Sequence, residues 1–180
     1  YEKSIKEDKS LKEKTQKDQI DSIKKEITKY KVKPDYNSDL ELSVNIKNLN
    51  KQLEKIKIQN VIKDKNKNKI KDKKIGNFVM RQQILYDFPP KELRGIIDQG
   101  KKDIKKGIVV SISTFEEKVG VAVGVTNDLT SKYDAVKFVK TASEILGGKG
   151  GGGRKDFAQA GGNDKGKIED ALKAITDKIN

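Results

Sequence analysis

The sequence predicts an α/β (α+β) globular domain with a small mixed sheet, preceded by an α-helical coiled-coil hairpin. All 15 glycines and all five phenylalanines fall from Gly76 onward, as expected of strands, tight turns and a packed core. The first 75 residues hold no glycine and one proline, Pro34, which favours long helices. We therefore expect a helical subdomain over residues 1–74 and a globular, glycine-rich subdomain over residues 75–180.

An apolar stripe marks the first predicted helix, over residues 2–32. Its spacing of three, four and three residues puts one narrow stripe on a single helix face. The stripe consists of Ile20, Ile23, Ile27 and Tyr30. Pro34 then ends the helix, and Ser38 is the candidate N-cap of the next one.

The second predicted helix carries a heptad seam with a spacing of four, three, four and three residues. The seam consists of Leu42, Ile46, Leu49, Leu53 and Ile56, and Asn60 falls at the next step. A stripe this narrow needs a partner helix, since it cannot bury itself alone. We expect the preceding helix to fold back onto it. Self-association through the same surface stays open, so the five seam residues are also the candidate dimerisation surface.

Residues 63–74, KDKNKNKIKDKK, hold seven lysines and two aspartates. We interpret this run as a solvated connector between the two subdomains. Its cations could also lie against phosphates, but the run has no aromatic side chain to stack on a base.

Two apolar runs predict neighbouring strands in the globular part, over residues 107–113 and 118–125, joined by a loop at 114–117. The second run alternates valines with small residues, which are Gly120, Ala122 and Gly124. This small face allows a helix or another backbone to approach closely. Residues 77–86 form a further candidate strand.

Three helices are predicted around these strands. The first begins at Pro89 and Pro90, which suit a first helical turn. Ser131 is the candidate N-cap of the second, which Gly147 ends. Asn163 or Asp164 caps the last one, whose apolar stripe is Ile168, Leu172, Ile175 and Ile179.

The excess of 40 Lys and Arg over 27 Asp and Glu gives a net charge of +13. This charge favours a polyanionic partner, nucleic acid before a membrane surface, although a basic surface without such a target is the alternative. The chain has no Cys and no His, which excludes disulfides, a Ser-His-Asp triad and Cys/His zinc sites within it. A carboxylate site for Mg²⁺ or Ca²⁺ stays open. No apolar run approaches the roughly 20 residues of a membrane helix.

The segment 147–162, GGKGGGGRKDFAQAGG, has glycine at eight of its 16 positions. Ordering so many glycines is costly in entropy, so we expect unusual backbone angles or amides brought close to an anion. Its candidate RNA-binding residues are Lys149, Gly150, Gly151, Gly152, Gly153, Arg154, Lys155 and Gln159. Asp156 could orient Arg154 or cap the turn, and the planar fork of Arg154 suits phosphate oxygens or a guanine edge. A flexible solvated loop is the alternative.

Two nucleotide-binding motifs are nearly matched in this region. Gly148, Gly150 and Gly153 have the dinucleotide spacing, but they follow a predicted helix instead of a strand. Gly161, Gly166 and Lys167 begin a P-loop pattern, but an isoleucine stands where Ser or Thr must hold Mg²⁺. We favour neither.

The segment 147–162 resembles the glycine-rich signature of the C-terminal domain of alanyl-tRNA synthetase, a family related to the accessory domain of DHH-type phosphoesterases. GGKGGG, Arg154, Asp156 and AQAGG occur in order, and the resemblance covers residues 107–179 well and 75–106 loosely. Two departures are a fourth glycine before Arg154, and Lys155 and Phe157 where the family usually has Pro and Met. In this family a coiled-coil hairpin precedes the globular unit and supports dimerisation.

The resemblance implies a non-catalytic fragment of a cytoplasmic alanine–tRNA ligase, and the start at Tyr1 agrees with a fragment. Its implied task is to hold the outer corner of alanine-specific tRNA, to link aminoacylation with editing, and to support a homodimer. ATP and Zn are then expected only in the missing catalytic and editing domains. No catalytic residue, cofactor or metal site is expected in this fragment.

Two alternatives share some of these features. An accessory domain of a DHH-type phosphoesterase would use the same glycine loop and Arg154 to hold single-stranded nucleic acid. A purely structural coiled-coil adaptor would need only the seam.

Overall fold

The computed structural model describes residues 2–64 and 68–179. The chain divides into two compact units, Tyr1–Asn60 and Val61–Asn180, and each is described by itself. The sequence-based boundary between residues 74 and 75 differs from this division, because residues 68–75 form a strand of the second unit.

The first unit is built on α1 (Glu2–Lys29) and α2 (Leu42–Lys63). The apolar stripe of α1 is buried against the seam of α2, which confirms the predicted pairing of the two helices within one chain. The buried residues are Ile20, Ile23, Ile27, Leu49 and Leu53, and the partly buried residues packed on them are Tyr30, Leu42, Ile46 and Ile56.

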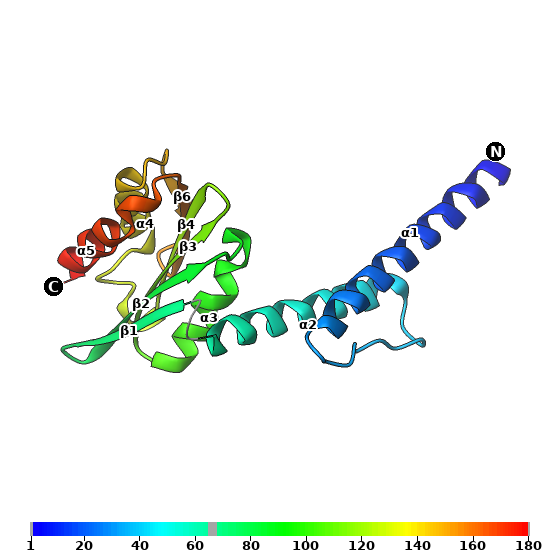
Figure 1. Ribbon diagram of the computed structural model, residues 1–180, viewed down its shortest axis with the longest axis horizontal. Coiled ribbons are helices and arrows are strands. Elements are labelled where there is room, and N and C mark those ends of the chain that lie inside the picture. Colours follow the sequence, from blue (N-terminus) through cyan, green and yellow to red (C-terminus); the bar gives the residue numbers. More distant parts are fainter. Residues whose placement is uncertain (1, 65–67, 180) are drawn as a thin grey trace. The chain divides into compact units, whose positions relative to one another are not determined.

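The two helices run in the same direction (Figure 1). Glu26 in α1 pairs with Lys57 in α2 at 2.9 Å. Toward the start of both helices, the α1 residues from Lys9 to Gln16 share a groove with Glu41 and Ser43. Facing residues are therefore offset by about 30 positions at both places, and a constant offset defines a parallel pair. An apolar stripe predicts that helices pair but does not specify their direction.

The segment that joins the helices returns along α2 and is tied to it by two amide side chains. Gln52 accepts from the Asp35 N–H at 2.8 Å and donates to the Lys33 carbonyl at 2.9 Å. The buried Asn45 accepts from the Asn37 N–H at 3.0 Å and donates to the Asn37 carbonyl at 2.8 Å. The prediction that Ser38 caps α2 is wrong: the helix begins at Leu42, and Asn45 orders the segment before it.

The second unit contains a six-stranded mixed sheet in the order β1-β2-β3-β4-β6-β5. The strands are β1 (Asn68–Ile75), β2 (Phe78–Tyr86), β3 (Gly107–Phe115), β4 (Lys118–Val125), β5 (Gly151–Gly153) and β6 (Phe157–Gly162). The β2–β3 pair is parallel and the other pairs are antiparallel. The predicted mixed sheet is confirmed, and so are its strands at 77–86, 107–113 and 118–125.

The interpretation of residues 63–74 as a solvated connector is wrong for residues 68–74, which belong to β1. Every residue of β1 between its two ends is exposed. The strand therefore lacks the alternation of apolar and polar residues by which a half-buried strand is recognised in a sequence. The strand is specified by backbone pairing with β2, which needs no apolar side chain, and lysines are typical of edge strands. Residues 65–67 lie outside the described residues.

Helices cover both faces of the sheet (Figure 1). On one face, η1 (Pro90–Glu92) leads into α3 (Leu93–Ile104), which packs on β3 and β4. The small residues of β4 permit this contact: a Cβ on Gly124 would lie 2.3 Å from Ile97 Cγ2, and one on Gly120 would lie 2.6 Å from Pro90 Cβ. The predicted close approach on the small face is confirmed.

The other face carries the main core beneath α4 (Ala135–Ile145) and α5 (Ile168–Ile179). Short turns precede both helices, η2 (Asn127–Leu129) and η3 (Lys165–Lys167). Asp164 caps η3, which leads into α5, as the sequence predicts. The prediction for Ser131 is wrong: Asp134 caps α4, and its Oδ1 accepts from the Val136 N–H at 2.9 Å.

Candidate nucleic-acid interface

The glycine-rich segment forms a β-hairpin at one edge of the sheet. β5 is the last strand in the sheet order, and its three glycines are exposed. Arg154 and Phe157 exchange both backbone hydrogen bonds, at 2.7 and 3.2 Å, and so close a two-residue turn. The segment is therefore an ordered hairpin and not a loose loop.

The hydrogen-bond pattern of β5 determines which of its amide N–H groups point away from β6. Hydrogen-bonded and non-hydrogen-bonded pairs alternate in an antiparallel ladder, so Gly152 is the next residue after Arg154 to bond to β6. The N–H groups of Gly151 and Gly153 then point away from β6. No other described strand pairs with that side of β5, so these amides lie at an open edge.

Ser143 of α4 completes the base of the hairpin. Its buried hydroxyl donates to the Gly161 carbonyl at 2.7 Å and accepts from the Gly150 N–H at 3.2 Å. The hydroxyl thus bridges Gly150 and Gly161, which would be the next hydrogen-bonded pair of the β5–β6 ladder. Nothing in the sequence indicates this role, because a serine within an amphipathic helix is ordinary until its partners are placed.

The backbone geometry requires glycine at several positions of β5 and of the segment that precedes it. Gly150 has φ +98°, which side chains other than glycine rarely adopt. A Cβ on Gly151 would lie 2.3 Å from the Gln159 carbonyl oxygen. A Cβ on Gly152, in contrast, would meet nothing within 4 Å. A Cβ on Gly153 would likewise lie 2.4 Å from a carbonyl oxygen of β6. The backbone therefore requires glycine at Gly150, Gly151 and Gly153, and at Gly152 the lack of a side chain leaves the backbone exposed.

Three predicted cations, Lys149, Arg154 and Lys155, are exposed on this hairpin. The predicted contact between Asp156 and Arg154 is present, with 3.2 Å between Nε and Oδ1. The Arg154 side chain remains 70 % exposed, so its guanidinium is accessible to an anion.

Helix α3 adds two cations that sequence reasoning did not identify. Lys101 donates from Nζ to the Asp156 carbonyl at 2.7 Å and so anchors the hairpin turn. Its partial burial lowers its pKa from the ordinary value. Arg94 lies over the Phe157 ring, 5.1 Å from its centroid. The two cations are seven residues apart and share a helix face, but only the folded structure shows that this face meets the hairpin.

Gln159 lies opposite Gly152 in the β5–β6 ladder, but its side chain is engaged within the fold. It lies on β6, half-buried, and its Nε2 donates to the Pro90 carbonyl at 2.7 Å. One of its donors is therefore used within the fold. The five seam residues lie in the helix pair of the first unit.

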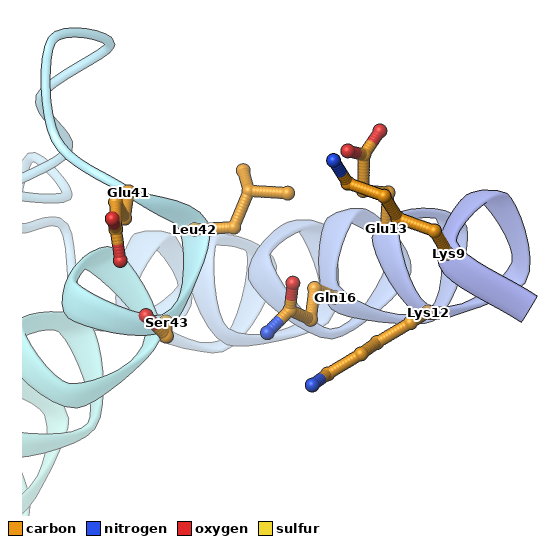
Figure 2. Close-up of a pocket in the computed structure, with 7 residues that line it drawn as sticks. All are labelled: Lys9, Lys12, Glu13, Gln16, Glu41, Leu42 and Ser43. Carbon is orange, nitrogen blue, oxygen red and sulfur yellow. The ribbon is translucent and has the colours of Figure 1, made fainter. Parts of the chain in front are cut away.

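The helix pair contains a shallow groove of about 460 Å³ beside the start of α2. Figure 2 shows the residues that line it, which are Lys9, Lys12, Glu13, Gln16, Glu41, Leu42 and Ser43. Cations and carboxylates are mixed along its walls, so it has no net preference for an anion.

Residues 2–64 and 68–179 contain no group of three or more His, Cys, Asp or Glu side chains suited to a metal ion. No helix within these ranges is long and apolar enough to cross a membrane.

The DHHA1 family matches residues 76–180, and the chain belongs to this family. Its relatives are alanine–tRNA ligases. The enzyme of Granulibacter bethesdensis is 46 % identical over 109 residues, which are 61 % of this chain and 12 % of the relative. That of Parvibaculum lavamentivorans is 53 % identical over 87 residues, 48 % of this chain and 10 % of the relative.

Two solved structures are similar. The C-Ala domain of Aquifex aeolicus alanyl-tRNA synthetase matches with a TM-score of 0.56 and 30 % identity, over 60 % of this chain and 96 % of that one. A DHH-domain member of the s1p family of ribosomal proteins has a TM-score of 0.50 and 16 % identity, over 77 % of this chain and 32 % of that one, and shows the fold alone. The alanyl-tRNA synthetase interpretation is therefore favoured over the DHH-type phosphoesterase. The chain spans about 12 % of the relatives' length.

Proposed function

We propose that this chain is the C-terminal tRNA-binding part of an alanine–tRNA ligase. It holds the outer corner of alanine-specific tRNA, so that aminoacylation and editing act on one bound molecule. The observation that carries this proposal is the exposed β5–β6 hairpin, with open-edge amides beside Lys149, Arg154 and Lys155. The similarity to alanine–tRNA ligases and to a C-Ala domain supports it.

The hairpin suits contact with a folded RNA for two physical reasons. Lysine and arginine that neutralise phosphates release counterions, which favours binding at low salt. Glycine leaves no side chain between the backbone and the ligand, so amide N–H groups can donate directly to phosphate or sugar oxygens. Lys101 holds the hairpin turn in place through the Asp156 carbonyl.

Several properties belong to the whole ligase. ATP and zinc would be held by its catalytic and editing domains, in the cytoplasm where tRNA is charged for protein biosynthesis. This chain would contribute RNA binding without an active site of its own.

Self-association is the second part of the proposal. Leu49 and Leu53 are buried against α1, so a second copy could reach these two seam residues only by exchanging helices. Sedimentation equilibrium at tens of micromolar tests this. A dimer that Leu49→Lys disperses supports the proposal, and a monomeric parent chain contradicts it.

The tRNA-binding proposal is tested with Lys149→Ala combined with Arg154→Ala. We expect weaker binding of an alanine-specific tRNA transcript, and a log–log salt slope flatter by about 0.7–0.9 for each phosphate that the variant no longer neutralises. Lys118→Ala with Lys137→Ala is the matched control, since it removes the same charge from exposed sites outside the hairpin. Equal affinity and equal slope in the two double variants would remove the hairpin from the interface.

A further inference from the structure

The edge of the sheet opposite the β5–β6 hairpin carries a regular row of cations. β1 is the first strand in the sheet order. Its residues Lys69, Lys71 and Lys73 are exposed and alternate with other residues along the strand, so they share one face of the sheet. This spacing puts a positive charge about every 6.6 Å along the edge.

A groove lies beneath part of this row. It has a volume of about 220 Å³ and is formed by β1, β2 and α5. Lys71 and Lys73 come from β1, and Lys173 comes from α5. The side chains of Gln82 and Thr176 join the two walls, with 2.6 Å between Nε2 and Oγ1. The groove therefore has a fixed floor and cations on two sides.

Arg81 of β2 is paired with carboxylates, in contrast to the lysines of the groove. On the face toward α3, Arg81 is held by Asp72 at 2.8 Å and by Asp103 at 2.9 Å, so its charge is neutralised locally. In the groove, none of Lys71, Lys73 and Lys173 makes an ion pair with any described residue. Glu169 is the one carboxylate among the groove's lining residues, so the groove keeps a positive balance.

We propose that the β1–α5 groove is a second RNA contact, which binds the phosphodiester backbone without reading bases. Its lysines offer point charges and mobile donors, which suit phosphate oxygens. No aromatic side chain lines the groove, so base stacking is not available there. The inference rests on the proposed function, because it assigns a further surface for the same RNA.

The two contacts are far enough apart to act independently. β1 and β5 are separated by five strand spacings of about 4.8 Å, or about 24 Å across the sheet. Substitutions at distant sites without shared partners add in free energy. The losses of tRNA affinity caused by the groove and by the hairpin should therefore add.

The test measures tRNA binding by the 180-residue chain at several salt concentrations. Lys71→Ala with Lys73→Ala should weaken binding and flatten the log–log salt slope by about 0.7–0.9 for each phosphate left without its lysine. The sharpest control compares Lys73→Ala with Lys74→Ala. These neighbouring lysines of β1 are both exposed and carry the same charge, but they lie on opposite faces of the strand, and Lys73 is the one that lines the groove. Only Lys73→Ala should change the slope.

The outcomes separate this inference from the proposed function. If Lys149→Ala with Arg154→Ala weakens binding but the groove variants do not, the groove inference is overturned and the hairpin proposal stands. Equal effects of Lys73→Ala and Lys74→Ala would also overturn it, since only net charge would then matter. Self-association of the groove variants with unchanged tRNA affinity would assign the lysines to protection of the edge strand instead. If the parent chain fails to bind tRNA at all, the proposed function itself is contradicted.

Discussion

Single side chains hold this fold together at positions where two elements meet. Arg81 of β2 reaches Asp72 on β1 and Asp103 on α3, and Gln99 donates to the same Asp103 at 2.9 Å. Ser143 joins α4 to both strands of the hairpin. Each of these side chains ties together segments that the chain alone does not bring into contact.

The Asp72–Arg81 pair predicts a pH dependence of stability. The hydrogen bond from Arg81 lowers the pKa of Asp72 below its ordinary value of 3.8. A lowered folded-state pKa adds stability above pH 3.8, and this stability is lost as the pH falls below 3.8 toward the folded-state pKa. Since Asp72 is half-exposed, we expect Asp72→Asn to cost only about 0.5 kcal/mol at pH 7.

Urea unfolding of the parent chain and Asp72→Asn between about pH 2 and pH 7 measures this effect. The difference in unfolding free energy should shrink as the pH falls below 3.8. A difference that is constant over the whole range would show that the charge pair is not its source. Asp170→Asn, at an exposed position on α5 with no ion pair to a described residue, is the control.

At the scale of elements, the β5–β6 hairpin offers a matched pair of glycine substitutions. Gly151→Ala would place a Cβ 2.3 Å from the Gln159 carbonyl oxygen, so we expect it to distort the hairpin. Gly152→Ala meets nothing within 4 Å and should leave the hairpin intact. If the backbone of β5 lies against RNA, Gly152→Ala should nevertheless weaken tRNA binding, because its methyl group prevents close approach.

Amide chemical shifts of β6 and tRNA affinity together measure these effects. We expect Gly151→Ala to shift the β6 amides and Gly152→Ala to leave them in place. Full tRNA affinity in Gly152→Ala would argue that cations alone make the contact. Unchanged β6 amides in Gly151→Ala would contradict the close approach to Gln159.

The elements differ in how well the sequence specifies them. The alternating valines of β4 and the apolar stripe of α5 could be predicted because each buries one face against a core. β1 could not, because backbone pairing alone specifies an edge strand whose side chains are solvated. Arg94 and Lys101 could not be identified as site residues, since they matter only through their contacts with the hairpin. Lys101 bonds a residue 55 positions away in the sequence, and Arg94 contacts one that is 63 positions away.

At the scale of the whole molecule, the two units have separate cores. The core of the first unit consists of residues of α1 and α2, and the main core of the second consists of residues from Phe78 to Ile179. Their separation predicts local effects of core substitutions. Ile27→Ala should destabilise the helix pair by about 2–5 kcal/mol, because it removes a fully buried side chain. It should leave the sheet unit unchanged.

Hydrogen exchange resolves the two units in one experiment. Amides of α1 and α2 should exchange faster in Ile27→Ala, while those of β3 keep their protection. Ile175→Ala, in the core of the sheet unit, is the reciprocal control. Loss of β3 protection in Ile27→Ala would show that the two units unfold together.

The return segment between α1 and α2 gives the helix pair a mechanical property. Many coiled coils can slip by a turn, since a repeating seam offers several equivalent alignments. Here Gln52 and Asn45 hold the segment from Lys33 to Asn37 against α2, so the short stretch between the end of α1 and Lys33 limits how far α1 can slide. The register of the two helices is therefore fixed. A force along the axis of the pair would be transmitted from one end to the other, since the helices cannot slide past each other to absorb it.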